Sequence, residues 1–461
     1  MSPLTGDRER GDDVVVAPAT PPGVSALAVV RLTGPPGRTI AVARRLAPDF
    51  PADAAPRRAL LLGLVDADGR ALDRGVVLFW AAPHSPTGEE VVEIFCHGSS
   101  GVVAGLVDAA RRAGARPAER GEFTRRALEN GKMDLAEAEG LAALARAESR
   151  GAARRALGLV EGALSRRVGD ARERTLDALA AIEAALDFAD DVSGEEALCA
   201  REELAAVAAE LLAIAAAARA TGDRRPVVAI LGRPNAGKST LFNALVGRDR
   251  AIVTATPGTT RDAIAETIEI AGEGVTLLDT AGLRATGDEI ERLGVEIAER
   301  AGERADLVLY VVDAQIGRCG EDEEFLRKGR GESALVVMTK ADLLRGADAR
   351  APVDPSDLPR WDAVVSARTG SGLDALRAAI AARLGLVEVE GELLVLARHK
   401  EALEAAAALL GDAAALAASG AGAEIVASRV REALAALGAI TGETATEDLL
   451  DRIFSTFCVG K

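Results

Sequence analysis

The sequence predicts a multidomain protein with an α+β N-terminal domain, a discontinuous all-α helical domain, and an α/β domain inserted between the two helical halves. Three observations predict this class. Runs rich in β-branched residues fill the start of the chain, alanine-rich runs with helical periodicity fill two later stretches, and short apolar runs alternate with helical segments between those stretches. The predicted domain boundaries are 1–130, 131–223, 224–384 and 385–461.

The N-terminal prediction depends on strand signals. The run VVVAPATPPGVSALAVVRLTG, which follows Asp13, predicts two strands around a Pro-Pro-Gly turn. Residues 76–80 and 91–96 add further β-branched segments, and residues 102–114 have a helical pattern. Strands and helices in this mixture predict an α+β domain.

The helical texture begins at Gly121, continues to about residue 220 and returns from about 391 to 457. The segment between these stretches contains the apolar runs VVAIL, VTLLDT, ADLVLYVVD, ALVVMTKAD and WDAVVSA. Apolar strands separated by helices predict a doubly wound parallel sheet. The simplest arrangement inserts this α/β domain into a helical domain whose halves meet in space.

Composition excludes several classes of protein. The chain has 461 residues, 49% hydrophobic and 27% charged, and only nine Phe, two Trp and one Tyr, so its cores must come mainly from Leu, Val, Ile and Ala. A net charge of −16 offers no basic face for strong, sequence-independent nucleic-acid binding. Any RNA contact is therefore expected to be local or shared with a partner.

The four cysteines lie far apart without a Cys-x-x-Cys pair, which argues against a disulfide framework or a zinc ribbon and fits a reducing cytosol. No charged start followed by an apolar run opens the chain, so we expect a cytoplasmic protein without membrane association. His97, beside Cys96, has no further ligand at a suitable spacing, and we expect a structural role for it.

A phosphate-binding loop is the strongest motif. The strand 226–231 runs into Gly-Arg-Pro-Asn-Ala-Gly-Lys-Ser at 232–239, and a helix follows. Backbone amides of this loop and the helix N-terminus can bind phosphate oxygens, Lys238 can reach the β and γ phosphates, and Ser239 can ligate magnesium.

Two further segments complete a nucleotide site. Asp279, followed by Thr-Ala-Gly, comes directly after an apolar strand, where its carboxylate can hold magnesium through water. Gly282 lets its amide approach the γ-phosphate. Between loop and strand lies Gly-Thr-Thr-Arg-Asp at 258–262, in which Thr260 is the candidate for a second magnesium hydroxyl.

The base is predicted to be guanine. The strand ALVVM ends in Thr339-Lys340-Ala341-Asp342, and the Asp342 carboxylate can accept both donor hydrogens of guanine's Watson–Crick edge, a pair that adenine lacks. Thr339 stands where the familiar motif has asparagine, which leaves the amide contact to the base open. Ser366-Ala367-Arg368 supplies backbone support for the ring. The four ordered motifs indicate GTP.

The residue that orients the attacking water is not found within these motifs. Leu283 follows the DTAG segment, where Ras-like enzymes often carry a water-orienting glutamine. A carboxylate must then replace it, and Glu291 is the first candidate, ahead of Asp288 and Glu289. Asn235 could offer a side-chain oxygen to a monovalent cation beside the phosphates, in place of an arginine finger.

Together with the family resemblance described next, the motifs imply a set of GTP-binding residues: Asn235, Ala236, Gly237, Lys238, Ser239, Thr240, Thr254, Ala255, Thr256, Pro257, Gly258, Thr259, Thr260, Asp279, Thr280, Ala281, Gly282, Thr339, Lys340, Ala341, Asp342, Ser366, Ala367 and Arg368.

Over nearly its full length the chain resembles the tRNA-modifying GTPase family MnmE, also called TrmE. The resemblance is carried by the segments ATPPG, TGEEVVEIFCHG, RPAERGEFTRRALENGKMDLAEAE, GRPNAGKST, AIVTATPGTTRD, DTAGLR and LLDRIFSTFCVGK. It implies a potassium-dependent GTPase whose domains meet across a homodimer. Asn235, Thr254, Thr256 and Thr259 would then hold potassium, Ser239 and Thr260 magnesium, and Glu291 would act with Lys238 in catalysis.

The resemblance also implies an N-terminal domain that dimerises and binds 5-formyl- or methylene-tetrahydrofolate. The matching positions are Arg31, Glu93 and Lys132, with Lys461 from the C-terminal tail. Glutamylated pterins present carboxylates for Arg and Lys and ring amides for Glu, so these residue types suit the ligand.

In the family, the reaction installs an aminomethyl-type group at carbon 5 of the wobble uridine of certain tRNAs, together with the flavoprotein MnmG. The chain has no Gly-x-Gly-x-x-Gly after a strand, so FAD is expected on that partner, in a heterotetramer. Cys458, which lies near the end in a helical context, is a nucleophile, a proton carrier or a small apolar filler. Two rival functions remain open: a folate-dependent methyltransferase with a regulatory GTPase, and a ribosome-assembly GTPase of the Era or Der kind.

Overall fold

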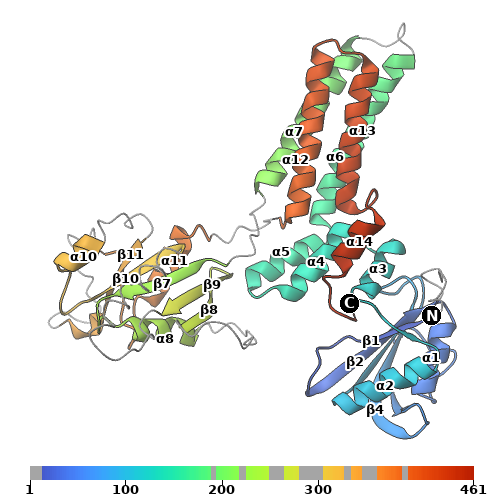
Figure 1. Ribbon diagram of the computed structural model, residues 1–461, viewed down its shortest axis with the longest axis horizontal. Coiled ribbons are helices and arrows are strands. Elements are labelled where there is room, and N and C mark those ends of the chain that lie inside the picture. Colours follow the sequence, from blue (N-terminus) through green and yellow to red (C-terminus); the bar gives the residue numbers. More distant parts are fainter. Residues whose placement is uncertain are drawn as a thin grey trace, which may run out of the picture. The chain divides into compact units, whose positions relative to one another are not determined.

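The computed structural model describes residues 13–187, 194–217, 225–248, 264–279, 305–325, 334–344, 361–386 and 393–460 (Figure 1). The chain divides into two compact units. Unit 1 contains residues 1–142, 158–216 and 397–461, and unit 2 contains residues 143–157 and 217–396. The predicted fold class is confirmed: an α+β part and helices form unit 1, and an inserted α/β part forms unit 2. The N-terminal and helical parts share one unit, so the predicted boundaries between them stay predictions.

The N-terminal part of unit 1 is a six-stranded sheet in the order β3-β4-β5-β2-β1-β6. Its strands are β1 (Val15–Pro18), β2 (Ser25–Gly34), β3 (Leu60–Val65), β4 (Ala71–Trp80), β5 (Glu90–Gly98) and β6 (Arg116–Pro117). All neighbours are antiparallel except the β1–β6 pair, and the predicted Pro-Pro-Gly turn joins β1 to β2.

Two helices, α1 (Arg38–Leu46) and α2 (Ser100–Arg112), cover one face of this sheet. Side chains alternate along a strand, so Ala28, Val30 and Leu32 of β2 enter the core beneath the helices together with Val92 and Ile94 of β5. Residues of the opposite parity, Arg31 and Glu93 among them, therefore lie on the other face.

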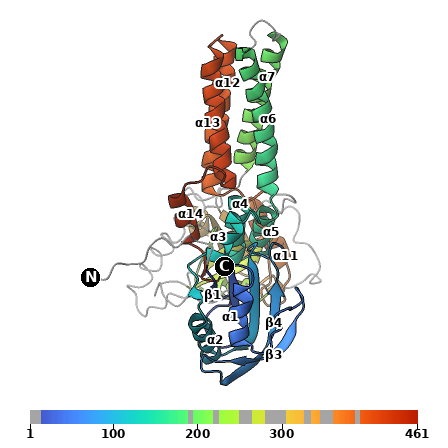
Figure 2. The same cartoon turned by 90° about the vertical axis from the view of Figure 1, so that its right-hand side faces the viewer.

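The helical part of unit 1 is alanine-rich, as its composition predicts. Its long helices are α6 (Ala163–Asp187), α7 (Gly194–Ala217), α12 (Ala397–Ala418) and α13 (Ala423–Thr441), which run side by side in both views (Figures 1 and 2). Buried Ala406, Ala407, Ala413 and Ala414 alternate with Leu403 and Leu410 along α12, so small side chains let the helices approach closely.

Shorter helices join the bundle to the sheet: α3 (Glu122–Glu129), α4 (Leu135–Arg146) and α14 (Glu447–Phe454). Phe454 and Phe457 pack with Leu135 and Ala138 in a small apolar cluster, their rings 5.2 Å apart. The helix α5 (Arg150–Val160) follows α4. Among the described residues, no helix is both long and apolar enough to span a membrane.

Unit 2 contains a second six-stranded sheet, in the order β12-β11-β10-β7-β9-β8. The strands are β7 (Val227–Gly232), β8 (Ile264–Ile270), β9 (Glu273–Asp279), β10 (Leu307–Asp313), β11 (Ala334–Thr339) and β12 (Ala363–Val364). The described helices of this sheet are α8 (Lys238–Arg248), α10 (Gly320–Phe325), the 3₁₀ turn η4 (Ala341–Leu343) and α11 (Leu373–Arg383).

One strand departs from the predicted parallel sheet. β8 pairs antiparallel with β9, whereas the other neighbours are parallel. The two-residue turn Ala271-Gly272 has φ of 49° and 78°, a left-handed geometry that joins antiparallel strands directly. The predicted apolar runs did not include β8, and the expectation of an all-parallel sheet is wrong at this strand because hydrophobic periodicity does not report strand direction.

Candidate functional site

The phosphate-binding loop lies between β7 and α8, at the carboxyl edge of the unit 2 sheet. Gly232, at the end of β7, has φ of 142°, and a Cβ there would lie 2.3 Å from the Val311 carbonyl oxygen. Asn235 and Gly237 also have positive φ, 62° and 94°. Only glycine fits at 232, and the strained backbone turns the loop tightly into the helix, as the motif predicts.

Lys238 closes this loop on itself. Its Nζ donates to the carbonyl oxygens of Gly232 and Arg233, 2.8 Å away in each case. Burial lowers the pKa of the Lys238 ammonium, while the nearby Asp279 carboxylate acts in the opposite sense. The partly buried ammonium is bonded to neutral carbonyls, so phosphate oxygens would be stronger partners for it.

Thr339, the last residue of β11, and Lys340, which follows it, fix the other side of the loop. The Thr339 hydroxyl donates to the Ala236 carbonyl at 2.5 Å and lies 3.2 Å from the Val312 carbonyl. The Lys340 ammonium donates to the Asn235 carbonyl at 2.8 Å and to Asp313 at 2.7 Å, which holds the pKa of Asp313 below its usual value against the effect of burial. The threonine that replaces the motif's asparagine therefore supports the phosphate loop.

Asp342, the predicted guanine acceptor, is placed on η4 beside the segment after β12. Its carboxylate accepts from the Ser366 hydroxyl at 2.6 Å and from Arg368 Nε at 2.8 Å, and these two donors lower its pKa. The sequence assigned backbone support to Ser366, Ala367 and Arg368 and did not predict these side-chain bonds. Arg368 is 72% exposed, so its pairing is a surface interaction that a base can displace.

The remaining described residues of the predicted GTP-binding set lie around the same edge. Ser239 and Thr240 are exposed in the first turn of α8, and Ala341 donates its amide to the Val365 carbonyl at 3.2 Å. Asp279 ends β9, which pairs with β7 so that Ile230 lies opposite Asp279. The hydroxyl of Ser239 and the carboxylate of Asp279 are hard oxygen donors of the kind that magnesium takes, so the residues present fit that ion.

Several predicted site residues lie outside the described residues. They are Thr254, Ala255, Thr256, Pro257, Gly258, Thr259, Thr260, Thr280, Ala281, Gly282, Glu291 and Lys461. For the potassium set, only Asn235 is described. The binding of potassium by Asn235 and the catalytic role of Glu291 stay predictions.

A second polar site lies on the outer face of the N-terminal sheet. Arg31 of β2 and Glu93 of β5 are register partners, and Arg31 Nε and Nη2 donate to Glu93 Oε1 at 3.0 and 2.8 Å. The Trp80 indole donates to the other Glu93 oxygen at 3.3 Å. The C-terminal tail reaches this site, because Arg31 Nη1 donates to the Gly460 carbonyl at 3.2 Å.

Lys132 lies in the segment after α3, beside the loop that precedes β5. A Cβ on Gly88 would lie 3.4 Å from Lys132 Cγ, and the neighbouring Asn130 amide donates to the Thr87 carbonyl at 2.8 Å. Thr87 in turn bonds Thr33, which lies two residues beyond Arg31 on β2. Three of the four residues matched to the folate site therefore come from neighbouring segments of one unit, and Gly460 directly precedes the fourth.

The C-terminal tail is extended where the sequence predicts a helical context for Cys458. The helix α14 ends at Phe454, and Val459 forms an antiparallel bridge with Arg120. The Cys458 carbonyl accepts from the Gly121 amide, so the tail pairs with another segment instead of continuing α14. Cys458 is an exposed free thiol, so the apolar-filler interpretation is wrong in this structure.

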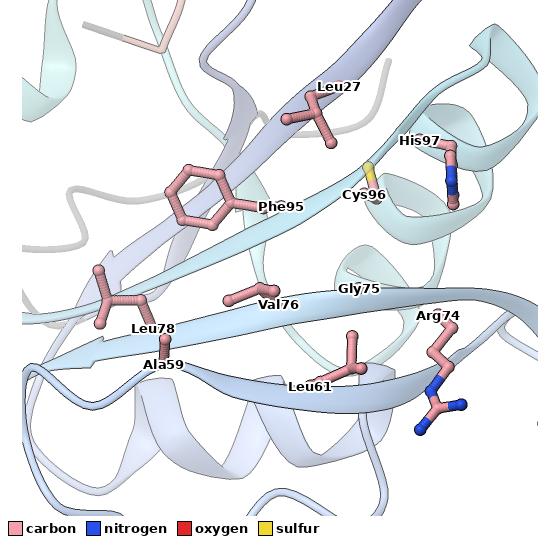
Figure 3. A pocket seen from close by; sticks show the side chains of 10 residues that line it. All are labelled: Leu27, Ala59, Leu61, Arg74, Gly75, Val76, Leu78, Phe95, Cys96 and His97. Carbon is pink, nitrogen blue, oxygen red and sulfur yellow. The ribbon is translucent and has the colours of Figure 1, made fainter.

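Next to the Arg31–Glu93 pair, the same sheet face is apolar and hollowed. A pocket of about 420 Å³ is lined by β2 to β5, and Figure 3 shows Leu61, Leu78 and Phe95 around it. His97 lies at its rim, with Nδ1 2.8 Å from an Asp73 oxygen. No group of three His, Cys, Asp or Glu side chains placed to hold a metal occurs in the described part of the chain. The structural role of His97 stays a prediction.

Two protein-family models match the chain. One, the MnmE helical domain, matches residues 135–458, and the other, the GTP-binding protein TrmE N-terminus, matches residues 14–132. The tRNA modification GTPase MnmE of Symbiobacterium thermophilum is 42% identical over 478 residues, covering 98% of this chain and 100% of its own length. That of Phenylobacterium zucineum is 44% identical over 455 residues, covering 97% and 100%.

Among solved structures, a variant of Era from Aquifex aeolicus bound to GDP and AlF4− is 34% identical and covers 37% of this chain and 58% of that chain. The TM-score is 0.28, too low to support a structural argument.

Proposed function

The chain belongs to the MnmE family of tRNA modification GTPases and is a GTP hydrolase acting in tRNA modification, and from that premise we propose a function for each of its two polar sites. GTP hydrolysis in unit 2 is potassium-dependent and drives a conformational cycle. A tetrahydrofolate bound on the N-terminal sheet supplies one carbon for an aminomethyl or carboxymethylaminomethyl group at carbon 5 of the wobble uridine. The hydrogen bonds from Lys238, Thr339 and Lys340 to carbonyls of the phosphate loop are the observation that supports the GTP site.

In this proposal each residue of the nucleotide site has one task. Lys238 leaves its carbonyl partners for the β and γ phosphates, and Ser239 and Thr260 hold magnesium. Asn235, Thr254, Thr256 and Thr259 hold potassium, which supplies positive charge to the transferring phosphoryl group. Glu291 orients the attacking water. Asp342 exchanges its bond with Arg368 for the donors of the guanine edge.

Potassium dependence is tested by measuring GTP turnover of the full chain in potassium and in sodium at equal ionic strength. We expect more than about tenfold faster turnover in potassium, since one well-placed electrostatic partner in a transition state contributes that much or more. Asn235→Ala should abolish the difference, and Glu291→Ala should slow hydrolysis while GTP affinity stays near that of the parent. Equal rates in both salts would contradict the proposal.

The folate site is supported by the pairing of Arg31 with Glu93, by the contact of the tail with Arg31, and by the position of Lys132 beside the loop that precedes β5. Lys132→Ala should weaken 5-formyl-tetrahydrofolate binding by about tenfold, the usual loss when one charge-assisted hydrogen bond is removed, and leave GTP turnover unchanged. Lys400→Ala, on the surface of α12, is the matched control. Unchanged folate affinity in Lys132→Ala would remove this residue from the site.

We further propose a homodimer in which a second copy covers the apolar sheet face. Leu27 and Leu61 beside the pocket are 63% and 58% exposed, unusual for side chains of this size on one sheet. Leu61→Asp should shift the chain from dimer to monomer in light scattering, whereas Leu157→Asp, at another exposed leucine, should not. A monomeric parent would contradict the homodimer.

The partners follow from the same reasoning. A FAD-containing MnmG forms a heterotetramer with the dimer and carries much of the tRNA surface, which the net charge of −16 favours. The four free thiols fit a cytoplasmic location. Modified uridine should form only when this chain, MnmG, GTP and the folate are all present, and uridine methylation without MnmG would favour the folate-dependent methyltransferase instead.

A further inference from the structure

The phosphate loop contains a second cation, Arg233, whose partners lie outside the nucleotide motifs. Arg233 follows Gly232 at the end of β7, and its Nη2 donates to the Gly317 carbonyl at 2.8 Å. The same nitrogen lies 3.2 Å from Asp322 Oδ2. Both partners belong to the segment between β10 and the end of α10, which none of the sequence motifs includes.

Asp322 is a fully buried carboxylate with an exposed fraction of 0%. The hydroxyl of Tyr310 donates to its Oδ1 at 2.9 Å, and the Cys319 amide donates to Oδ2 at 2.8 Å. Burial, together with this carboxylate, raises the pKa of the Tyr310 phenol, so the phenol stays protonated and remains a donor. A buried charge of this kind requires a compensating cation, and Arg233 supplies it.

The group is anchored to the strand that carries the loop. Tyr310 on β10 is the register partner of Leu231 on β7, one residue before Gly232. Thr339 and Lys340 hold the carbonyls of Ala236 and Asn235 in the second half of the loop, whereas Arg233 ties down its first half. The loop is thus held from two sides by unrelated segments.

We propose that Arg233 is a positioning residue for nucleotide binding, fixed by Asp322 and, through it, by Tyr310. With the guanidinium held by the buried carboxylate, the loop keeps the curvature that points its amides at phosphate, and the arginine stays away from the reacting phosphoryl group. The inference uses the GTP site alone and is independent of the potassium and folate proposals.

The test measures GDP affinity in the presence of magnesium for Arg233→Gln, Asp322→Asn and the double variant of the full chain. Each single variant should lose about tenfold, a value typical of a buried charged hydrogen bond, and the double variant should lose about the same, because both changes break one interaction. Additive losses, or affinities equal to the parent, would overturn the proposal. GTP binding by the parent, measured alongside, tests the GTPase assignment separately.

If Arg233 and Asp322 only stabilised the fold, their interaction would have a different effect. Its loss in Asp322→Asn would lower the nucleotide-free melting temperature but leave GDP affinity and the split between kcat and KM unchanged, and that result would also refute positioning. If Asp322→Asn fails to fold, Tyr310→Phe removes only one hydroxyl and should still weaken GDP by about two- to threefold. Arg318→Gln is the matched control, since Arg318 lies in the same segment over the Trp361 ring, 4.9 Å from its centroid, and should keep parental affinity.

Discussion

At the phosphate loop, the Lys238 ammonium donates to two neutral backbone carbonyls, whereas on the N-terminal sheet the Arg31 guanidinium donates twice to the Glu93 carboxylate. The first site keeps its positive charge available, and the second neutralises it internally. A site of the first kind suits a polyphosphate, and a site that offers both a donor and an acceptor suits the polar edge of a ring. The predictions below test that contrast, beginning with the largest expected effect.

Removal of the Lys238 charge should have the largest effect. Lys238→Ala should lower GTP affinity on the order of 100-fold or more, because a desolvated cation on a phosphate contributes a charge pair of several kcal/mol. Isothermal titration with GTP measures this, and Lys400→Ala is the control. Folate binding should not change in either variant. If Lys238→Ala kept GTP affinity within about threefold of the parent, the loop would not use its lysine as the contrast requires.

A buried ion cluster tests whether the two units respond separately. Glu139 of α4 bonds Arg398 and the fully buried His399 of α12, at 2.6 Å in each case. Glu139→Gln should lower the free energy of unfolding of unit 1 by about 3 kcal/mol, since it removes one partner of a buried ion pair. The melting transition that GDP shifts, assigned to unit 2, should not move. Glu183→Gln, which breaks an exposed pair with Arg431, should change stability by less than about 0.5 kcal/mol.

The Glu139 carboxyl also makes the stability of unit 1 depend on pH in the acid range. Burial alone would raise the pKa of Glu139, but the hydrogen bonds from His399 and Arg398 outweigh it and lower the pKa below the usual 4.5. The stabilisation is therefore complete above pH 4.5 and is lost as pH falls through the lowered pKa. The free energies of unfolding of the parent and of Glu139→Gln, measured between neutral and acid pH, should converge below the lowered pKa of Glu139. Constant separation of the two curves would contradict this sign.

The internally neutralised site should respond less strongly than the loop. Glu93→Gln should weaken 5-formyl-tetrahydrofolate by about tenfold, because the acceptor for the ring amide loses its charge while Arg31 keeps a neutral partner. Fluorescence of Trp80, whose indole donates to Glu93, should change in the ligand-free protein. Asp68→Asn on the same domain surface is the control. If Glu93→Gln lost more folate affinity than Lys238→Ala loses GTP affinity, the contrast between the two sites would be reversed.

The smallest effect is expected at the exposed Arg368–Asp342 pair. Arg368→Gln should change GTP affinity by less than about threefold, since exposed ion pairs contribute little, and the change should shrink as salt is added. Affinity measured at low and high salt checks both statements. An effect comparable to Lys238→Ala would mean that Arg368 contacts the nucleotide with a buried charge.

The phosphate loop was predictable because its chemistry is local. Gly232 to Ser239 lie in one stretch, and the strand before and the helix after are visible in the hydrophobic pattern. The role of Thr339 was not, since its bond to Ala236 crosses 103 residues of sequence and depends on the order of β7, β10 and β11. Arg233 and Asp322 were missed for the same reason: a buried acid inside the run GEDEEF has no distinguishing sequence signal.

Sequence by itself determined the strand–loop–helix of the phosphate loop and the division into sheet-forming and helical stretches, because these depend on neighbours a few residues apart. Only the tertiary structure decided that Arg31 faces Glu93, that the tail brings Gly460 to Arg31, that Cys458 is exposed on an extended segment, and that β8 runs antiparallel. The physical reason is that register, strand order and burial arise from contacts between distant segments, which no local pattern of residues encodes.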